Sequence, residues 1–467
     1  MSMPFNHPLI DRYASKEMVD IFSEESKYRS WRKFWIILAE SQKELGLPIT
    51  DEQIEEMKKY SDDVNIDVAK EIEKELNHDV MSHIEAYGMQ AKLAKPIIHL
   101  GATSSEVTDN SEMYIIFKAL LLVRKRLIDV IKSLLDFADR YKDLPCLSYT
   151  HLQPAQPTTV GRRAVLWAYD LFLDLEEVDD FISRMRTRGV KGTTGTQASY
   201  LELFDYDHDK VKKLDDMVSR KLGFRESFWI TGQTYSRKYD YIILSKLSTI
   251  GSSSSKFAND IRYLQSVGEI EEPFGRKQVG SSAMPYKRNP ILSERINSLA
   301  RYLLSLPLVA LQNHSTQFLE RTLDDSANRR IIIPEAFLCV DAILLLYNKI
   351  VNGLVVNENV ILRRMKEMLP FYAVENILMR AVKNGGDRQY LHKVIRDKAM
   401  MVVEKNRSGD SVNLLDELKK EDVPDVLKKA VEDVRDIKFF VGRSVEQVVE
   451  VSQKIRDYID KFDLEKF

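Results

Sequence analysis

The chain has 467 residues, 44% of them hydrophobic, and a formal charge of −2 at pH 7, which argues against a disordered protein and against a global basic field for nucleic acid. Two cysteines exclude a disulfide framework and a four-cysteine zinc site, and we expect both to be buried. The chain contains no run of eighteen apolar residues, so no membrane span is predicted. The N-terminal residues lack the pattern of a secretory signal. We therefore expect a cytoplasmic protein without nucleic-acid or membrane partners.

The first region, up to about residue 105, is expected to hold short helices, because proline and glycine interrupt it. Thr50 and Gln53 have the spacing of a capping box and mark a helix start. His78 and His83 stand five residues apart, unlike the i, i+4 pair of a helical zinc site. The spacing therefore predicts no metal site at these histidines.

A hydroxyl-rich loop, Gly101–Asn110, precedes the longest helical stretch. Its serines and threonines, together with Asp109, are typical of a helix N-cap. The same hydroxyl groups are suited to binding a substrate. The residue pattern leaves both roles open.

The middle of the chain, residues 106–356, is dominated by long helices. Residues 108–144 contain neither glycine nor proline, and Pro145 ends the stretch. Apolar residues recur there at three- and four-residue spacing, so one helix face is predicted to be buried: Met113, Ile116, Leu120, Val123, Leu127, Val130, Ile131, Leu134 and Leu135. Further helices are predicted over 162–188, 233–250, 308–333 and 335–352. Such helices pack as a bundle, and their number suggests oligomerisation through it.

The last region, residues 357–467, has shorter and more charged segments, whose charge runs are typical of solvated helix faces. The sequence thus predicts an all-α protein of three helical domains, covering residues 1–105, 106–356 and 357–467.

Three further segments lack the residue pattern of a helix and are candidates for functional loops. Gly280–Pro290 is a polar loop with two serines, and Thr150–Gly161 holds a histidine among prolines. Glu320–Arg330 carries three arginines, which suit a phosphate or, as an alternative, a surface ion-pair network with Asp324 and Asp325. The chain has neither a G-x-x-x-x-G-K nor a G-x-G-x-x-G motif, so side chains would have to hold any phosphate.

Read as ordered strings, these loops resemble those of a known superfamily. Residues 280–290, GSSAMPYKRNP, match the pattern G-S-S-x-M-P-x-K-x-N-P of the fumarase/aspartase superfamily, and the T-H-x-Q-x-A-x-P-T-T pattern of residues 150–159 is similar to it as well. Within the superfamily, three segments resemble the adenylosuccinate lyases: His78-Asp79-Val80, Pro285-Tyr286-Lys287-Arg288-Asn289-Pro290 and Arg321-Thr322-Leu323-Asp324-Asp325-Ser326. The resemblance runs from about residue 12 to at least residue 337.

The resemblance implies a homotetramer whose long helices form a common bundle and whose active sites each take loops from three subunits. It implies non-hydrolytic elimination of fumarate from adenylosuccinate, giving AMP, and from the succinylated aminoimidazole carboxamide ribotide of purine synthesis. It implies no metal and no organic cofactor.

The same resemblance assigns roles to residues. Ser281 is the expected base and His151 the expected acid that protonates the leaving amine, while His78 orients the substrate. Removing a proton beside a carboxylate loads negative charge onto its oxygens, so donors such as Lys287 and Asn289 are needed there. The implied substrate-binding residues are Arg12, Tyr13, Arg295, Arg321, Ser326 and Arg330 as a basic funnel that includes the phosphate side, Gln233 at the succinyl or base portion, and Asp79, Thr103, Ser104, Thr150, Met284 and Glu294.

Two alternatives remain. A lyase acting on argininosuccinate would share the fold and the mechanism but would have no phosphate to bind, which the basic segment 321–330 argues against. A non-catalytic helical scaffold of the same fold would not need Ser281, His151, Lys287 and Asn289, all of which are present.

Overall fold

The structure, a computed structural model, describes residues 6–434 and 436–461. The first five residues of the segment searched for a secretory signal lie outside the described residues. Helices account for 68% of the protein, which confirms the helical class. The described residues also form two small antiparallel sheets of two strands each, which the sequence patterns did not indicate.

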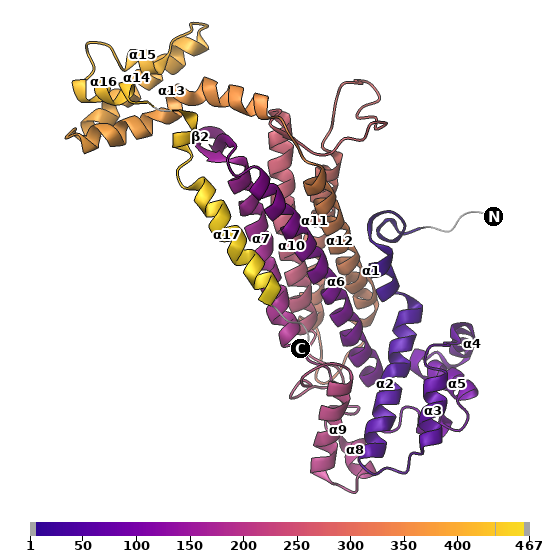
Figure 1. The fold of residues 1–467 in the computed structure, drawn as a ribbon. Coiled ribbons are helices and arrows are strands. Elements are labelled where there is room, and N and C mark those ends of the chain that lie inside the picture. The colour runs from indigo at the N-terminus through magenta and orange to yellow at the C-terminus, as the bar shows by residue number, and fades with distance from the viewer. Residues whose placement is uncertain (1–5, 435, 462–467) are drawn as a thin grey trace.

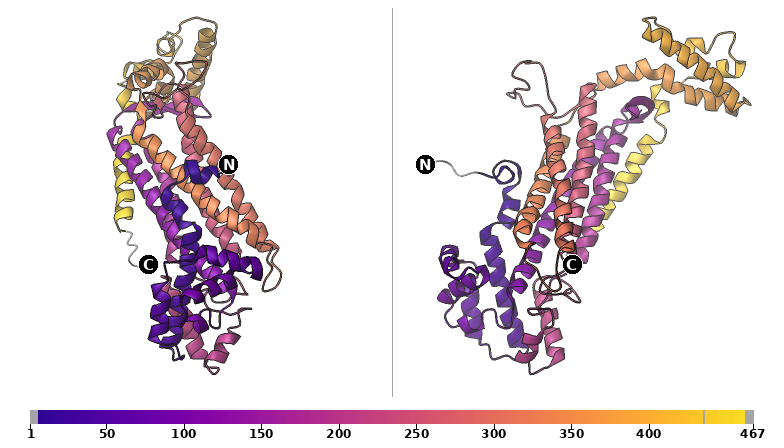
Figure 2. Two further views of the ribbon diagram at one scale, coloured as in Figure 1. Left: turned by 90° about the vertical axis from the view of Figure 1, so that its right-hand side faces the viewer. Right: turned by 180° about the vertical axis from the view of Figure 1, so that it is seen from behind.

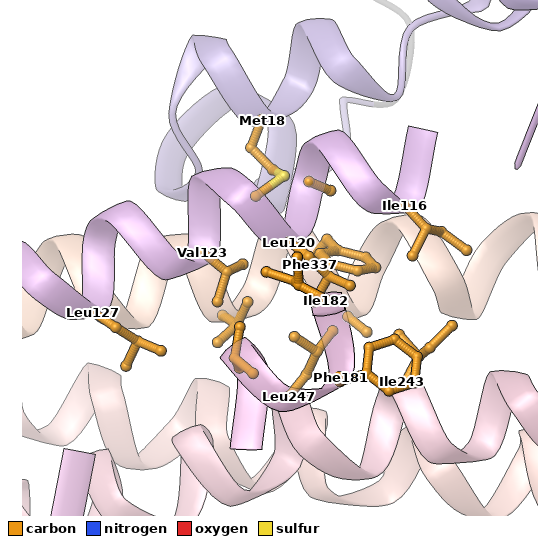
Figure 3. Close-up of a cluster of buried hydrophobic side chains, with 14 of the residues drawn as sticks. Met18, Ile116, Leu120, Val123, Leu127, Phe181, Ile182, Ile243, Leu247 and Phe337 are labelled. Atoms are coloured by element: carbon orange, nitrogen blue, oxygen red, sulfur yellow. The ribbon is translucent and has the colours of Figure 1, made fainter. Parts of the chain in front are cut away.

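The centre of the molecule is a bundle of long helices that lie side by side (Figure 1). They are α6 (Ser104–Arg140), α7 (Val160–Ser183), α10 (Lys238–Ser266), α11 (Ile291–Ser315) and α12 (Ser326–Gly353). The apolar face predicted for the first of them is confirmed, since all nine of its residues are at most 1% exposed. Figure 3 shows this face of α6 meeting side chains of α7, α10 and α12. Each buried aliphatic side chain of this size contributes about 1.5–3 kcal/mol.

Glycine does not end helix α10, which the sequence predicted to stop at residue 250. Gly251 lies inside it, and a Cβ atom there would lie 3.0 Å from Leu303 Cδ2 of α11. The missing side chain lets α10 and α11 pack closely, so this glycine serves packing rather than termination. The helix predicted over 162–188 also differs, because α7 begins at Val160 and ends at Ser183.

Two prolines lie inside helices of the bundle, and the predicted helices over 308–333 and 335–352 are therefore wrong. Pro307 lies within α11 and Pro334 within α12, and the chain breaks instead between residues 315 and 326. An interior proline removes one backbone hydrogen bond and costs about 3 kcal/mol. Both helices bury long apolar faces in the bundle, and that packing outweighs the local cost.

Shorter helices gather at one end of the bundle (Figure 1). The N-terminal ones include the capping box at Thr50 and Gln53, which is confirmed by hydrogen bonds of 3.2 and 3.0 Å. The helices at this end are α2 (Glu24–Glu44), α3 (Asp51–Lys59), α4 (Ile66–Leu76), α5 (Asp79–Gln90), α8 (Ala198–Leu203) and α9 (His208–Lys221). Helix α1 (Lys16–Ile21) lies beside the bundle and contacts α6 and α12.

The C-terminal helices lie mainly at the opposite end, and the last one turns back (Figure 2). Helix α13 (Glu358–Lys383) leaves the bundle and shares a separate small core with α14 (Arg388–Arg407), α15 (Leu414–Glu417) and α16 (Asp425–Glu432). Helix α17 (Ser444–Lys461) then packs along α6 and α7. The division into three domains stays a prediction.

Both small sheets lie next to segments predicted from the sequence to be functional loops. Strand β1 (Pro145–Thr150) pairs with β2 (Gln153–Thr159) as a hairpin, and β3 (Ile270–Glu271) pairs with β4 (Val355–Val356). Strands β1 and β2 flank His151, and β3 precedes residues 280–290. The segment Thr150–Gly161, which the sequence predicted to be a loop, instead forms the hairpin turn, strand β2 and the start of α7. Its prolines are tolerated because both strands are edge strands, where a missing N–H breaks few ladder bonds.

Helix α12 meets the length and composition criteria of a membrane span, with a mean hydropathy of 1.8 over its most apolar window. Within the protein 67% of that window is buried, and its residues pack against α6, α10 and α11. It is therefore a core helix of the bundle.

Cys146 and Cys339 are both buried and form no disulfide, as expected. Burial raises the pKa of the Cys339 thiol to about 12.

Candidate active site

The signature loop, residues 280–290, connects β3 to α11 and protrudes from the end of the bundle opposite the N-terminal helices (Figure 1). Ser281 Oγ accepts hydrogen bonds from the backbone N–H groups of Met284 at 3.0 Å and Ala283 at 3.3 Å. Two N–H donors aimed at one hydroxyl oxygen favour its deprotonated form. Most of the loop is exposed in the single chain, including Met284 and Tyr286.

The neck of this loop is closed by a tight backbone contact. Asn289 Nδ2 donates to the carbonyl of Gly280 at 2.8 Å, and a Cβ atom on Gly280 would lie 1.9 Å from the carbonyl oxygen of Lys287. Glycine is therefore required at position 280 for the two ends of the loop to meet. One amide N–H of Asn289 is used here, which leaves its second N–H for another acceptor. Lys287, Asn289 and Glu294 line an open cavity of about 420 Å³ beside the end of α10.

His151 sits at the tip of the β1–β2 hairpin. His151 and Leu152 form its two-residue turn and have φ angles of 52° and 58°. Such turns usually take glycine or asparagine, because other side chains are strained at positive φ by about 1–3 kcal/mol. Thr150 pairs with Gln153 and closes the turn. The exposed imidazole is thus presented on a conformation that the side chain itself does not favour.

A triad centred on the buried carboxylate of Glu269 anchors the hairpin to the base of the signature loop. Tyr149 Oη donates to Glu269 Oε1 at 2.6 Å, and Arg364 Nε of α13 donates to the same oxygen at 2.9 Å. Burial and the Glu269 carboxylate raise the pKa of the Tyr149 hydroxyl well above its usual range. The phenol therefore stays protonated and keeps the hydrogen bond that positions β1.

A second group, the His78 cluster, comprises His78, Asp79, Ser104 and Arg330. His78 caps α5, with Nδ1 accepting from the Met81 N–H at 3.3 Å. This bond places the proton of a neutral imidazole on Nε2, which lies 3.5 Å from Ser104 Oγ. The carboxylate oxygen Oδ2 of Asp79 lies 3.3 Å from the guanidinium nitrogen Nη2 of Arg330 on α12. Three elements thus bring four predicted site residues together.

The start of α6 is fixed by a capping box between Thr103 and Glu106, so the capping role left open for this loop is confirmed. Asp109, which was grouped with the cap, instead forms a buried ion pair with Arg237 at 3.2 Å. Ser104 points toward His78 rather than capping the helix. The loop therefore both caps α6 and contributes to the His78 cluster.

The arginine-rich segment forms ion pairs, and those of Arg321 and Arg329 are largely buried rather than on the surface. Arg321 and Arg237 both bind Asp325, at 2.8 and 2.6 Å, and Asp325 is fully buried. Arg329 is held by Asp240 at 2.7 Å. Arg330 differs from them, since 64% of its side chain is exposed. Ser326 is the first residue of α12 and lies one turn before Arg330. The backbone N–H of Gln233 donates to the backbone carbonyl of Glu320, in the same arginine-rich segment, at 3.1 Å.

A third group lies near the N-terminus. The π-helical turn η1 (Leu9–Tyr13) packs against α12. The guanidinium of Arg295 lies 5.5 Å from the ring centre of Tyr13, and that of Arg12 lies 5.7 Å from it. These three residues form a basic group around one phenol ring.

The predicted site residues therefore do not meet in one chain. Ser104 begins α6, and the hairpin with His151 follows its other end. With 37 residues, α6 spans about 55 Å, which separates the His78 cluster from His151. At the far end, the hairpin and the signature loop leave the bundle on different sides (Figures 1 and 2).

Several buried charges were missed in the sequence. Glu106 binds Arg188 at 2.9 Å, and both side chains are fully buried. The T-x-x-E spacing of Thr103 and Glu106 was a visible signal for the cap. No local pattern indicated its partner, which lies 82 residues further on.

His83 is not a neighbour of His78 in any metal-binding arrangement. Its ring stacks on Tyr28 with centroids 3.7 Å apart, and burial, followed by the charge of Lys27, lowers its pKa to about 4. Within residues 6–434 and 436–461, no group of three or more His, Cys, Asp and Glu side chains is arranged to hold a metal ion.

Comparison with solved structures identifies the fold. The crystal structure of fumarate lyase from Mesorhizobium sp. BNC1 matches with a TM-score of 0.81, covering 96% of this chain and all of that one at 21% identity. The 3-carboxy-cis,cis-muconate lactonizing enzyme from Pseudomonas putida matches with a TM-score of 0.80, covering 97% and 100% at 19% identity. At these identities the likeness shows the fold alone. The family profile described as Lyase matches residues 12–303.

Sequence relatives narrow the family. The profile described as adenylosuccinate lyase C-terminus matches residues 370–451. Adenylosuccinate lyase from Schistosoma mansoni is 46% identical over 98% of this chain and 97% of its own length. That of Saccharomyces cerevisiae is 46% identical over 96% and 94%, and that of Methanocaldococcus jannaschii 32% over 97% and 96%. The chain belongs to the adenylosuccinate lyase family of the fumarate lyases.

Proposed function

We propose that this enzyme, a carbon–nitrogen lyase, eliminates fumarate from adenylosuccinate to give AMP, and from the succinylated aminoimidazole carboxamide ribotide to give the carboxamide ribotide. The observation that carries the proposal is similarity to adenylosuccinate lyases over nearly the whole chain, with Ser281, His151, Lys287 and Asn289 all present. Both reactions belong to purine nucleotide synthesis, and the proposal includes a cytoplasmic location.

The chemistry explains the signature loop. A proton leaves the carbon beside a carboxylate while the C–N bond breaks at the neighbouring carbon. Ser281 takes the proton, and the N–H groups of Ala283 and Met284 favour its alkoxide form. Lys287 and Asn289 donate to the carboxylate, which takes up the charge of the carbanion. His151 protonates the departing amine, and imidazole suits this task near neutral pH.

The remaining residues bind the anionic substrate. A phosphate and two carboxylates give the nucleotide a charge of roughly −4, counting the second phosphate pKa of ~6. Thr103 and Ser104 are proposed to bind a carboxylate, with His78 and Asp79 orienting the substrate beside them. The other proposed contacts are Arg12, Tyr13, Arg295, Arg321, Ser326 and Arg330 for the basic funnel, Gln233 for the succinyl or base portion, and Thr150, Met284 and Glu294 near the reacting atoms.

A homotetramer would bring these groups together. About 55 Å of α6 lies between the His78 cluster and His151, so one chain cannot supply both to one substrate. Apolar residues also remain exposed along single faces of two bundle helices, which supports self-association: Leu166, Tyr169 and Leu173 on α7, and Leu304, Leu308 and Leu311 on α11. The proposed active sites each combine the His78 cluster, the His151 hairpin and the signature loop from three subunits.

One assay tests the proposal against its rivals. The protein is incubated with adenylosuccinate and, separately, with argininosuccinate, and fumarate is followed by ultraviolet absorbance. We expect fumarate from adenylosuccinate alone. Release from argininosuccinate instead would make it the other type of lyase, and no release from either would favour a non-catalytic scaffold. Light scattering should give about four times the chain mass of 54.1 kDa.

A further inference from the structure

Lys27 is a partly buried cation on α2 without an acidic partner. Its Nζ lies 4.9 Å from the ring centre of Tyr28 and 5.0 Å from that of Trp31. In the part of the chain that the structure describes, no carboxylate lies within ion-pairing distance of this ammonium. The aromatic rings offset part of the cost of removing the charge from water.

The carboxylates that act on Lys27 each have a cation of their own. Asp79 is paired with Arg330 at 3.3 Å, and Glu24 with Lys70 at 2.7 Å. A third, Glu112, is held by Arg329. Lys27 therefore adds a positive charge that the protein does not neutralise locally.

Burial and then the nearby charge of Arg330 lower the pKa of the Lys27 ammonium. A desolvated ammonium beside a second cation is unfavourable until an anion arrives. Such an arrangement favours binding of an anionic ligand, because the anion would form the ion pair that the ammonium lacks.

Lys27 also borders the His78 cluster. Tyr28, over which its ammonium lies, stacks on His83 at 3.7 Å, and His83 follows Asp79 by one turn of α5. Arg330, the exposed cation of that cluster, is the cation that acts most strongly on Lys27. Packing contacts connect the two positive side chains: Lys27 lies over Tyr28, Tyr28 stacks on His83, and Asp79, one turn before His83 on α5, pairs with Arg330.

We propose that Lys27 binds the phosphate group of the nucleotide together with Arg330. This inference rests on the proposed function, because it takes a nucleoside monophosphate as the ligand. The phosphate would supply the partner that Lys27 lacks, through a charge-assisted hydrogen bond.

The test compares Lys27→Met and Lys27→Arg with Lys33→Met as a matched control. Lys33 lies on the same helix, is also partly buried and places its Nζ 3.9 Å from the ring centre of Tyr114, and it lines a cavity to which Lys27 does not contribute. AMP and fumarate are used as product inhibitors, because AMP carries a phosphate and no carboxylate while fumarate has only carboxylates. Fumarate release by the unaltered enzyme is measured first, so failure of the proposed function is seen separately.

We expect Lys27→Met to weaken inhibition by AMP about ten- to a hundredfold, the range for losing a hydrogen bond to a charged group. Inhibition by fumarate should stay unchanged, Lys27→Arg should keep most of the AMP affinity, and Lys33→Met should match the unaltered enzyme. Unchanged AMP inhibition in Lys27→Met would overturn the proposal. Equal losses for AMP and fumarate, or a loss for fumarate alone, would overturn it as well.

A second measurement needs no variant and so does not depend on folding. Acetylation of Lys27 in the unaltered enzyme is followed by mass spectrometry with AMP, with fumarate and without ligand. AMP should slow modification of Lys27 but not of Lys33. If AMP leaves the modification rate of Lys27 unchanged, Lys27 does not bind phosphate.

Discussion

The carboxylate of Glu106 lies 2.9 Å from the guanidinium of Arg188, and neither side chain is exposed to solvent. The other carboxylate oxygen accepts from the Thr103 N–H at 2.8 Å and from the Tyr200 hydroxyl at 2.9 Å. The Gly192 N–H donates to the first oxygen at 2.7 Å. One buried carboxylate thus ties the start of α6 to the segment after α7.

Glu106→Ala should lower the free energy of unfolding by about 3–5 kcal/mol, because it leaves the Arg188 charge buried without a partner. Urea denaturation of the variant and the unaltered protein measures the difference. Glu25→Ala is the control, since Glu25 pairs with Arg29 on the surface and its loss should cost at most about 1 kcal/mol. Equal effects of the two substitutions would contradict the importance of the buried pair.

Ser281→Ala should reduce turnover at least about a hundredfold while substrate still binds, because loss of a general base costs ~10²–10⁴-fold. Single-turnover kinetics and a binding titration with adenylosuccinate separate the two effects. Ser282→Ala, one residue along the same exposed loop, should retain most activity. The opposite pattern would move the base to Ser282.

Mixing two inactive variants tests the shared site. His78→Ala and His151→Ala should each be nearly inactive, and they are combined in equal amounts under conditions that exchange subunits. With random assembly about one site in four receives an intact histidine at both positions, as exchangeable subunits of a closed oligomer allow. Activity per site should recover to about a quarter of that of the unaltered enzyme. No recovery, with mixed tetramers shown by mass spectrometry, would mean that both histidines serve a site from one chain.

Stability should fall in mild acid because of His83. Its pKa is about 4 in the folded protein, against 6.5 for an unperturbed histidine. As the pH falls below 6.5 the unfolded chain takes up a proton that the folded protein resists until about pH 4, so stability is lost across this window. At pH 5 this one group should cost about 2 kcal/mol relative to pH 8.

His83→Phe keeps a stacked ring and removes the titration. Urea denaturation at pH 8 and pH 5 should show a smaller loss for His83→Phe than for the unaltered protein. His392→Phe, which alters an exposed histidine, should not change the loss. An unchanged pH dependence in His83→Phe would show that His83 binds protons equally in both states.

Features encoded over a few residues could be predicted from the sequence. The three- and four-residue spacing from Met113 to Leu135 predicted the buried face of α6, since a regular helix turns the same side inward at that period. The capping box at Thr50 and the family resemblance of residues 280–290 were likewise contained in short strings. For such features neighbouring residues specify the outcome, and distant parts of the chain add little.

Contacts between distant segments were decided only by the tertiary structure. Pro334 lies inside α12 because packing of the whole helix exceeds the cost of one lost hydrogen bond. Arg321 and Arg330 are alike in sequence, yet buried Asp325 binds the first while the second stays largely exposed. The long bundle helices likewise place His78 and His151 far apart, although both belong to one predicted site. Local patterns carry no information on which charge meets which partner, because that depends on how helices separated by a hundred residues or more pack together.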